Sequence, residues 1–381
     1  MADQSAVYLD YAAATPMDKR VLDAMLPYMT GDFYNPSALY LRSKQVHSAI
    51  DSARAMVARG IGARPSEITF TSGGTESNNL AISGVMHQYP GGTMLISAIE
   101  HDSVRQMAKQ YEHKEIAVDN KGIVSLPKLR SAITDTTVLV SIMYANNEIG
   151  TVQPIREIAA LIQNVRKQRQ QAGNSMPLYL HTDACQATNY LDTQVARLGV
   201  DMMSLNGGKI YGPKQIGALY VRAGIVLQPQ IFGGGQEHGL RSGTENVPGI
   251  VGFAKALQIA QSMRAEEAKR LSALQKYCMS QLSAMKHVRI NGSQVHRLPN
   301  NISFTVAGSD NERVVMELDE RGIMCATGSA CSASKDEPSH VLCAIGLTDA
   351  DARSTIRVTM GRQTTQKDID RLLGALEEIA L

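Results

Sequence analysis

Hydrophobic residues recur at three- to four-residue spacing from Ser43 to Ile61, which predicts an amphipathic helix over this segment. Farther along, short apolar runs alternate with further helical patterns. We expect strands over these runs, namely Ile68–Thr71, Thr93–Ser97, Val138–Met143, Leu178–His181, Met202–Leu205 and Ile216–Val221. This alternation is typical of an α/β fold in which helices cover a mostly parallel sheet.

The pattern changes in the last third of the chain. A long helix is predicted from Val251 to Met285, and shorter strands such as Asn301–Val306 follow it. A last helix is expected over Ile369–Ile379. We therefore predict a large domain over residues 15–256 and a smaller α+β domain formed by residues 1–14 and 257–381.

Size and charge narrow the possible functions. The chain has 381 residues, 44% of them hydrophobic, which suffices for a large core. Its net charge of +2 is dispersed, so we expect neither a nucleic acid nor a membrane surface as partner. The dense basic run Arg166–Arg169 is expected on the solvent-exposed face of a helix. No stretch approaches the roughly 20 apolar residues of a membrane span, and Met1–Gln4 begins no secretion signal, so we expect a cytoplasmic protein.

Polar residues directly follow several predicted strands, among them Glu100–His101, Asn146 and Asp183. Ligands bind beyond the carboxyl ends of the strands in such sheets, so these residues are candidates for a site. The strand 68–71 runs into Ser72–Ser77, where Gly74 and Thr75 open a helix that could bind a phosphate. The alternative is a helix capped by Ser72 or Thr75 with no ligand.

Lys209 lies in a glycine-rich turn, Asn206–Lys214, between two predicted strands. It could be a solvated lysine in a hairpin loop, or a lysine that forms a Schiff base with a carbonyl cofactor. A nucleotide P-loop is excluded because Met203 stands where its first glycine would be. The later loop Phe232–Thr244 fails the dinucleotide fingerprint because His238 occupies the last glycine position.

Pyridoxal phosphate requires a lysine, an anion cradle, a carboxylate at the ring nitrogen and a flat group over the ring. The chain offers Lys209, Gly74 with Thr75, Asp183 and His101 for these roles. Taken singly, Asp183 could instead cap a turn and His101 could be an ordinary pocket histidine. No metal is expected, because His181 and Asp183 lack a third ligand and the cysteines lack a C-x-x-C pair.

Five cysteines, an odd number, fit free thiols in a reducing compartment. Cys185, Cys278 and Cys343 are expected to be small buried hydrophobic residues. Cys331 differs because it lies among glycine, serine and alanine, which predicts an exposed loop. An exposed thiol that can reach a cofactor is a candidate nucleophile.

These residues together resemble the NifS/IscS-type cysteine desulfurases, pyridoxal phosphate enzymes of the class V aminotransferase group. The resemblance extends from Tyr8 to about Leu373. It rests on these stretches: Leu9–Tyr11, Ala14–Pro16, Thr71–Asn79, Glu100–His101, Asn146–Gly150, Lys209–Lys214, Arg241–Thr244, Gly328–Cys331 and Glu337–Ser339.

The resemblance implies fold type I, the aspartate aminotransferase-like fold, and a homodimer. It gives Lys209 the Schiff-base role, His101 the ring-stacking and proton-shuttling role, and Cys331 the persulfide. Cofactor contacts are implied for the pyridine-nitrogen partner Asp183, the ring-hydroxyl donor Gln186, the phosphate ligand Thr75, and a phosphate ligand supplied by the other subunit, Thr244. Asn146 and Arg357 match the groups that hold the substrate, with Arg357 gripping its carboxylate.

The turn before the lysine departs from this family. Asn206-Gly207-Gly208 stands where Ser-Gly-His is usual, which changes two phosphate-binding side chains. Asn206 can still donate a hydrogen bond, whereas Gly208 can offer only its backbone N–H. We therefore expect weaker retention of the cofactor. Cys185 also stands where threonine is common.

The expected reaction converts L-cysteine to L-alanine and an enzyme-bound persulfide. The sulfur would pass to a protein acceptor, either a scaffold for iron–sulfur clusters or a protein of tRNA thiolation. Two alternatives stay open. One is another pyridoxal phosphate lyase or epimerase of this fold, acting for example on selenocysteine. The other is a cofactor-poor regulatory or assembly subunit, which only the altered turn supports.

Overall fold

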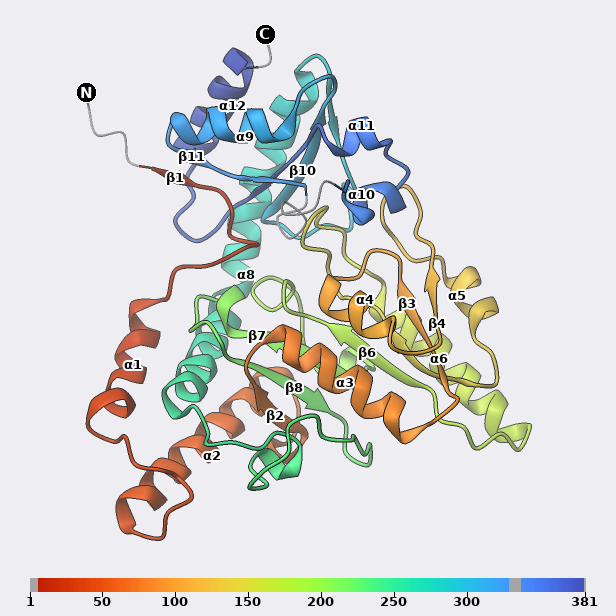
Figure 1. The fold of residues 1–381 in the computed structure, drawn as a ribbon. Coiled ribbons are helices and arrows are strands. Elements are labelled where there is room, and N and C mark those ends of the chain that lie inside the picture. The colour runs from red at the N-terminus through yellow and green to blue at the C-terminus, as the bar shows by residue number, and fades with distance from the viewer. Residues whose placement is uncertain (1–5, 329–336, 380–381) are drawn as a thin grey trace.

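The computed structural model describes residues 6–328 and 337–379. Its largest sheet has the strand order β2-β8-β7-β6-β5-β3-β4 (Figure 1). Within this sheet β8 is antiparallel to β2 and β7, and the remaining pairs are parallel. The carboxyl ends of the other six strands therefore meet at one edge. The strands are β2 (Ile68–Thr71), β3 (Thr93–Ser97), β4 (His113–Ile116), β5 (Thr137–Ser141), β6 (Tyr179–Asp183), β7 (Met202–Asn206) and β8 (Gly217–Val221).

Helices cover both faces of this sheet because its strands are apolar on both faces. Neighbouring side chains along a strand point to opposite faces. Met94 accordingly packs in one core with helix α3, whereas Leu95 packs in another core with helices α2, α6 and α8. The helices of this region are α1 (Lys19–Thr30), α2 (Leu41–Ile61), α3 (Gly74–Gln88), α4 (Asp102–Ala108), α5 (Leu126–Ala132), α6 (Ile155–Gln171), α7 (Val195–Leu198) and α8 (Val247–Ala284), with the short 3-10 turns η1 (Pro65–Glu67), η2 (Gly207–Lys209) and η3 (Glu237–Gly239).

A smaller antiparallel sheet, in the order β12-β13-β10-β9, forms the second part of the molecule, beside the parallel pair β1-β11. Its strands are β1 (Val7–Tyr8), β9 (Val288–Ile290), β10 (Asn301–Val306), β11 (Ile323–Met324), β12 (Ala326–Thr327) and β13 (Thr355–Thr359). Its helices are α9 (Asn311–Glu320), α10 (His340–Ala344), α11 (Asp349–Ala352) and α12 (Gln366–Ile379).

Helix α8 connects the two parts of the molecule (Figure 1). Its first half, around Phe253 and Leu257, packs in the core of the large sheet. Its second half, around Leu271 and Cys278, packs in the core of the small sheet together with Leu9 from the N-terminal segment. The predicted domain boundary at residues 256 and 257 falls inside this helix, and the division into domains stays a prediction.

The predicted α/β fold with a mostly parallel sheet and a smaller α+β part is confirmed. The prediction that the basic run Arg166–Arg169 lies on the solvent-exposed face of a helix was wrong in part. Arg169 is buried and donates to four backbone carbonyls, including those of Thr134 and Thr137, while Arg166 donates to the Leu178 carbonyl and pairs with Asp201. An arginine can bury its stem and satisfy backbone oxygens, which charge counting alone does not reveal.

The cysteines also differ from expectation at one position. Cys185 and Cys278 are buried as predicted, whereas Cys343 is exposed at the end of the short helix α10. Among residues 6–328 and 337–379, no three His, Cys, Asp or Glu side chains are grouped as a metal site would require. Nor does any helix within these ranges have the length and apolarity of a membrane span.

Candidate active site

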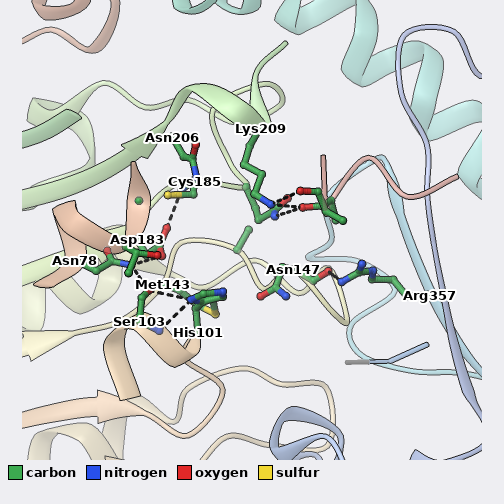
Figure 2. A pocket seen from close by; sticks show the side chains of 16 residues that line it. Asn78, His101, Ser103, Met143, Asn147, Asp183, Cys185, Asn206, Lys209 and Arg357 are labelled. Atoms are coloured by element: carbon green, nitrogen blue, oxygen red, sulfur yellow. Dashed lines mark hydrogen bonds between the residues drawn. The ribbon is translucent and has the colours of Figure 1, made fainter. Parts of the chain in front are cut away.

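Two adjoining hollows lie at the carboxyl edge of the large sheet. A cavity of about 290 Å³ is lined by residues that follow β3, β5, β6 and β7, and also by residues of β13 and of the N-terminal turn. A second hollow of about 280 Å³ lies over the start of α3. The two share Gly74, Thr75, Asn206 and Lys209. Figure 2 shows the lining side chains around one space, with Asp183 at one side and Arg357 at the other.

Lys209 ends the short turn η2 and extends into the cavity. Its Nζ donates to the carbonyl oxygens of Ala12 at 2.8 Å and Ala13 at 2.6 Å. The backbone of the turn is held by Asn189, whose Nδ2 donates to the Lys209 carbonyl at 2.7 Å. Gly207 is required because a Cβ there would lie 2.8 Å from the side chain of Ile216.

Asp183 ends strand β6, and its carboxylate is oriented by two donors. Asn78 Nδ2 donates to Oδ2 at 2.7 Å, and the backbone N–H of Cys185 donates to Oδ1 at 2.9 Å. Gln186, from the same loop, lines the cavity and donates to the Ala12 carbonyl at 3.0 Å. The loop after β6 thus presents an acceptor and a carboxamide to one space.

His101 is the N-cap of α4, and this position fixes its tautomer. The backbone N–H of Ser103 donates to His101 Nδ1 at 3.1 Å, so the neutral ring carries its proton on Nε2. Asn78 donates both to Ser103 Oγ, at 2.8 Å, and to Asp183. A chain of hydrogen bonds therefore connects the imidazole to the carboxylate.

The start of α3, where the sequence predicted a phosphate site, has no side-chain cap. Its N-cap is Gly73, at φ 144°, and makes no side-chain hydrogen bond, so capping by Ser72 or Thr75 is not observed. The Ser72 backbone N–H and hydroxyl instead bind Glu76, whose charge is balanced by Arg241 at 3.0 Å. Exposed first-turn N–H groups favour an anion at this end of the helix.

Asn206 changes the expected role of Gly208. The Gly208 N–H donates to Asn206 Oδ1 at 2.9 Å, so it does not face a phosphate as the sequence suggested. The Asn206 Nδ2 atom lies 3.5 Å from the point where a Cβ of Gly74 would be, and therefore faces the start of α3. A Cβ on Gly74 would also lie 2.6 Å from Cys185 Sγ, so this close approach requires a glycine.

Arg357 lies on β13 and is 2% exposed. Its Nη2 pairs with Asp10 Oδ1 at 2.7 Å, and its Nη1 contacts the Asn147 carbonyl at 3.4 Å. Within the described residues its Nε has no hydrogen-bond partner. A buried guanidinium with unused N–H donors beside a cavity is suited to a carboxylate ligand.

Asn146, which was predicted to hold the substrate, does not line the cavity. Asn146 is fully buried: its Nδ2 donates to the Ile99 carbonyl after β3, and its Oδ1 accepts from the N–H groups of Glu148 and Ile149 in its own loop. Asn147, and not Asn146, lines the cavity. Alternate residues of a loop face different sides, and the sequence does not show which one faces a ligand.

Two predicted residues are not brought to the cavity by the described chain. Thr244 is exposed in the loop that follows η3 and lines neither hollow. Cys331 lies outside the described residues. The sequence reasoning missed Asp10 and Asn78, although both lie in motifs it had singled out. It also missed Glu148, which is buried and accepts a hydrogen bond of 2.5 Å from Ser339.

These groups fit pyridoxal phosphate. Lys209 is a primary amine, Asp183 an oriented carboxylate and His101 a flat ring, and the uncapped turn of α3 offers N–H donors for a phosphate. Arg357 lines the same cavity, and its guanidinium fits the carboxylate of an amino acid.

The profile of the class-V aminotransferase family matches residues 7–372. Cysteine desulfurase IscS 1 of Archaeoglobus fulgidus is 43% identical over 97% of this chain and 95% of its own length. Cysteine desulfurase IscS of Dictyoglomus turgidum is 41% identical over 98% of this chain and 94% of its own.

Solved structures give the same result. A NifS-like protein superposes with a TM-score of 0.90 at 33% identity, over 98% of this chain and 99% of its own. SspA, solved in complex with cysteine, superposes with a TM-score of 0.80 at 36% identity, over 93% of this chain and 98% of its own. The chain therefore belongs to the class-V aminotransferase family of pyridoxal phosphate enzymes and, within it, to the cysteine desulfurases.

Proposed function

We propose that this protein converts L-cysteine to L-alanine and retains the sulfur as a persulfide on Cys331. The observation that supports this most directly is the convergence of Lys209, Asp183, His101 and Arg357 on one cavity from four separate segments. The sulfur then passes to a protein acceptor that serves iron–sulfur clusters or tRNA thiolation.

Pyridoxal phosphate, when bound, supplies an electron-withdrawing ring that stabilises negative charge at the substrate α-carbon. Lys209 would hold its aldehyde carbon and Asp183 its ring nitrogen, with His101 over the ring. The N-terminal turn of α3 and the Asn206 amide would hold its phosphate, and Gln186 its ring hydroxyl.

The side chains of the protein bind the substrate, transfer protons and accept the sulfur. Arg357 binds the substrate carboxylate, and Asn147, whose carbonyl contacts Arg357 Nη1, lines the same cavity. Lys209 Nζ, once the substrate amine has taken its place, removes the α-proton, and His101 delivers the proton that it carries on Nε2. The Cys331 thiolate attacks the substrate sulfur, so the C–S bond breaks, an S–S bond forms, and protonation of the three-carbon product gives alanine.

A homodimer completes the phosphate site in this proposal. Large apolar side chains are exposed on α1, on residues 33–41 and on residues 226–232, where Leu39 is 91% and Phe232 78% exposed. Such side chains on a soluble enzyme favour an interface between subunits. The neighbouring loop carries Thr244, which would then reach the phosphate of the other subunit.

We also infer a cytoplasmic location. Cys185, Cys278, Cys325 and Cys343 are free thiols, as expected in a reducing compartment.

Two substitutions test the assignment of the reactive groups. Lys209→Ala should abolish the yellow absorbance of the cofactor–lysine linkage, because no other lysine among the described residues lines the 290 Å³ cavity. Cys331→Ala should keep that absorbance and lose the sulfide released in the presence of a thiol reductant. Sulfide output that survives in Cys331→Ala would instead support a lyase that needs no enzyme thiol.

A further inference from the structure

The buried arginine of the site has a partner that the proposed function does not explain. Arg357 Nη2 pairs with Asp10 at 2.7 Å, and Asp10 comes from the N-terminal segment. We propose that Asp10 is a positioning residue for the substrate carboxylate, because it holds the Arg357 guanidinium with its remaining donors toward the cavity. This inference rests on the proposed function, which assigns the carboxylate to Arg357.

Both side chains of the pair come from fixed backbone. Asp10 forms a bridge with Thr359 on β13, and its carbonyl accepts hydrogen bonds from Tyr8 Oη at 2.9 Å and from the Ala13 N–H at 3.1 Å. Arg357 pairs with neighbouring strands on both sides of β13. Because Arg357 and Thr359 are two residues apart on one strand, the bridge brings Asp10 next to the guanidinium.

The energetics indicate that Asp10 orients Arg357 for the substrate carboxylate and does not compete with that carboxylate for the arginine. A guanidinium that is 2% exposed has little water around it, and leaving such a charge unpaired is strongly unfavourable. Asp10 Oδ1 engages one nitrogen of a group that has five N–H donors. Nη1 makes only a long contact with Asn147, so Nη1 and Nη2 each have a second N–H that neither Asp10 nor Asn147 uses. Donors therefore remain for a second carboxylate.

The same turn also contacts the reactive lysine. The carbonyls that follow Asp10, those of Ala12 and Ala13, accept hydrogen bonds from Lys209 Nζ. Residues 10–14 thus contact both the arginine and the lysine of the cavity. A side chain on this turn is well placed to keep the carboxylate subsite at a constant distance from the lysine.

A matched pair of ligands tests this role without turnover. L-Alanine carries the carboxylate, ethylamine is the same molecule without it, and neither has a thiol. Equilibrium binding of both ligands to the cofactor-loaded enzyme gives their dissociation constants. Asp10→Ala should raise the dissociation constant of L-alanine about tenfold or more, equivalent to ~1.4 kcal/mol, and leave that of ethylamine unchanged. Asp10→Asn should lie between wild type and Asp10→Ala, because its amide oxygen can still accept from Nη2.

Two further variants calibrate the measurement. Arg357→Ala should weaken the binding of L-alanine at least as much as Asp10→Ala does. Asp18→Asn, which removes a carboxylate paired with Arg20 and Arg362 elsewhere, should change neither affinity. The melting temperature of each cofactor-free variant shows whether a loss reflects unfolding, and if Asp10→Ala does not fold, Asp10→Asn carries the test.

The outcomes separate the two claims. If Arg357→Ala loses affinity for L-alanine and the Asp10 variants do not, the positioning role is wrong and the proposed function stands. If Asp10→Ala binds L-alanine more tightly, Asp10 competes with the substrate and the inference is overturned. If Arg357→Ala binds L-alanine as well as wild type does, the carboxylate assignment of the proposed function fails, and the inference fails with it.

Discussion

At the scale of single residues, the hollow over the start of α3 contains the turn that departs from the expected family pattern, Asn206-Gly207-Gly208. Asn206 uses its side-chain oxygen to hold the Gly208 N–H and turns its amide toward the start of α3. The turn thus keeps one side-chain donor for a phosphate where the family pattern has two. The hollow also stays open at Gly208, where a Cβ would meet no atom closer than 3.5 Å.

Gly208→His should therefore fit and should strengthen cofactor binding. A donor to a charged phosphate contributes about 1.5–3 kcal/mol, so we expect a dissociation constant at least about tenfold lower. Titration of the cofactor-free protein with pyridoxal phosphate measures it. Gly208→Phe, which adds a ring without a donor, serves as the control. An affinity of the histidine variant no higher than that of wild type would contradict weak retention in the natural chain.

The raised pKa of the buried Glu148 predicts that the stability of the protein depends on pH. Burial raises its pKa from 4.5 to about 7, although Ser339 and the charge of Arg357 oppose the shift. As the pH rises above 4.5, the unfolded chain releases this proton before the folded one does. The contribution of Glu148 to stability is therefore complete below pH 4.5 and is lost as the pH rises to about 7.

Glu148→Gln, which mimics the protonated acid, should remove this loss. Each pKa unit corresponds to 1.36 kcal/mol, so the variant should gain about 3 kcal/mol relative to wild type between pH 4.5 and 7. Urea unfolding across this range measures the difference. Glu157→Gln, at an exposed position, is the control. Parallel stability curves for wild type and Glu148→Gln would show that the pKa of Glu148 is not raised in the folded protein.

The sequence predicted the types of residue in the site better than the individual positions. Lys209, Asp183 and His101 line one cavity, and the sequence could single them out because each chemical role leaves few candidates at strand ends. Asn146 was chosen over Asn147 because two adjacent asparagines are equivalent until a backbone orients them. Asp10 was missed because its partner Arg357 is 347 residues away, and only the fold brings them together.

At the scale of elements, the loop after η3 is tied to the large sheet by a buried ion pair. Arg54 of α2 and Glu237 of η3 form two hydrogen bonds of 2.7 Å, and both side chains are less than a tenth exposed. Glu237 also accepts from the Phe70 N–H at 2.7 Å. This anchor holds the segment that continues to Thr244.

Glu237→Gln should be strongly destabilising, because it leaves the buried Arg54 charge without a counterion. Breaking such a pair costs about 3–5 kcal/mol. Guanidinium unfolding gives the change in free energy. The matched control is Glu317→Gln, which breaks an exposed pair with Arg313 and should leave the unfolding free energy nearly unchanged. Equal effects of the two substitutions would show that the Arg54–Glu237 pair is not an anchor.

Most elements could be predicted from hydrophobic spacing, because helix and strand periods differ and the core imposes them. The strands β2 and β10 match their predicted ranges, and the helix predicted from Val251 to Met285 is α8 with an earlier start. Strand direction could not be predicted in this way. A buried antiparallel strand such as β8 has the same apolar pattern as its parallel neighbours.

At the scale of the whole molecule, the cavity lies where the two parts of the chain meet. The large sheet supplies the lysine, the aspartate and the histidine, and the smaller part supplies Arg357. Helix α8 belongs to both cores and ties the parts together. The proposed dimer adds a third contributor, because Thr244 would complete the site of the partner.

Mixed dimers test whether Thr244 acts across the interface. Co-expression of Lys209→Ala with Thr244→Ala should restore activity to about a quarter to a half of wild type in the mixed dimer. One of its two sites then combines an intact Lys209 with the intact Thr244 of the other subunit. Each variant alone, purified as a dimer, is the control. Mixed dimers no more active than the variants alone would place Thr244 outside the partner's site.

The central claim is that alanine formation in the cavity leaves a persulfide on Cys331, and one experiment measures both products. Purified protein is incubated with L-cysteine, alanine is quantified, and the peptide that contains Cys331 is examined by mass spectrometry for one added sulfur atom. We predict one alanine for each persulfide in the first turnover, and neither product in excess of background in Cys331→Ala. Alanine formed at the wild-type rate by that variant, or a persulfide on another cysteine, would contradict the account.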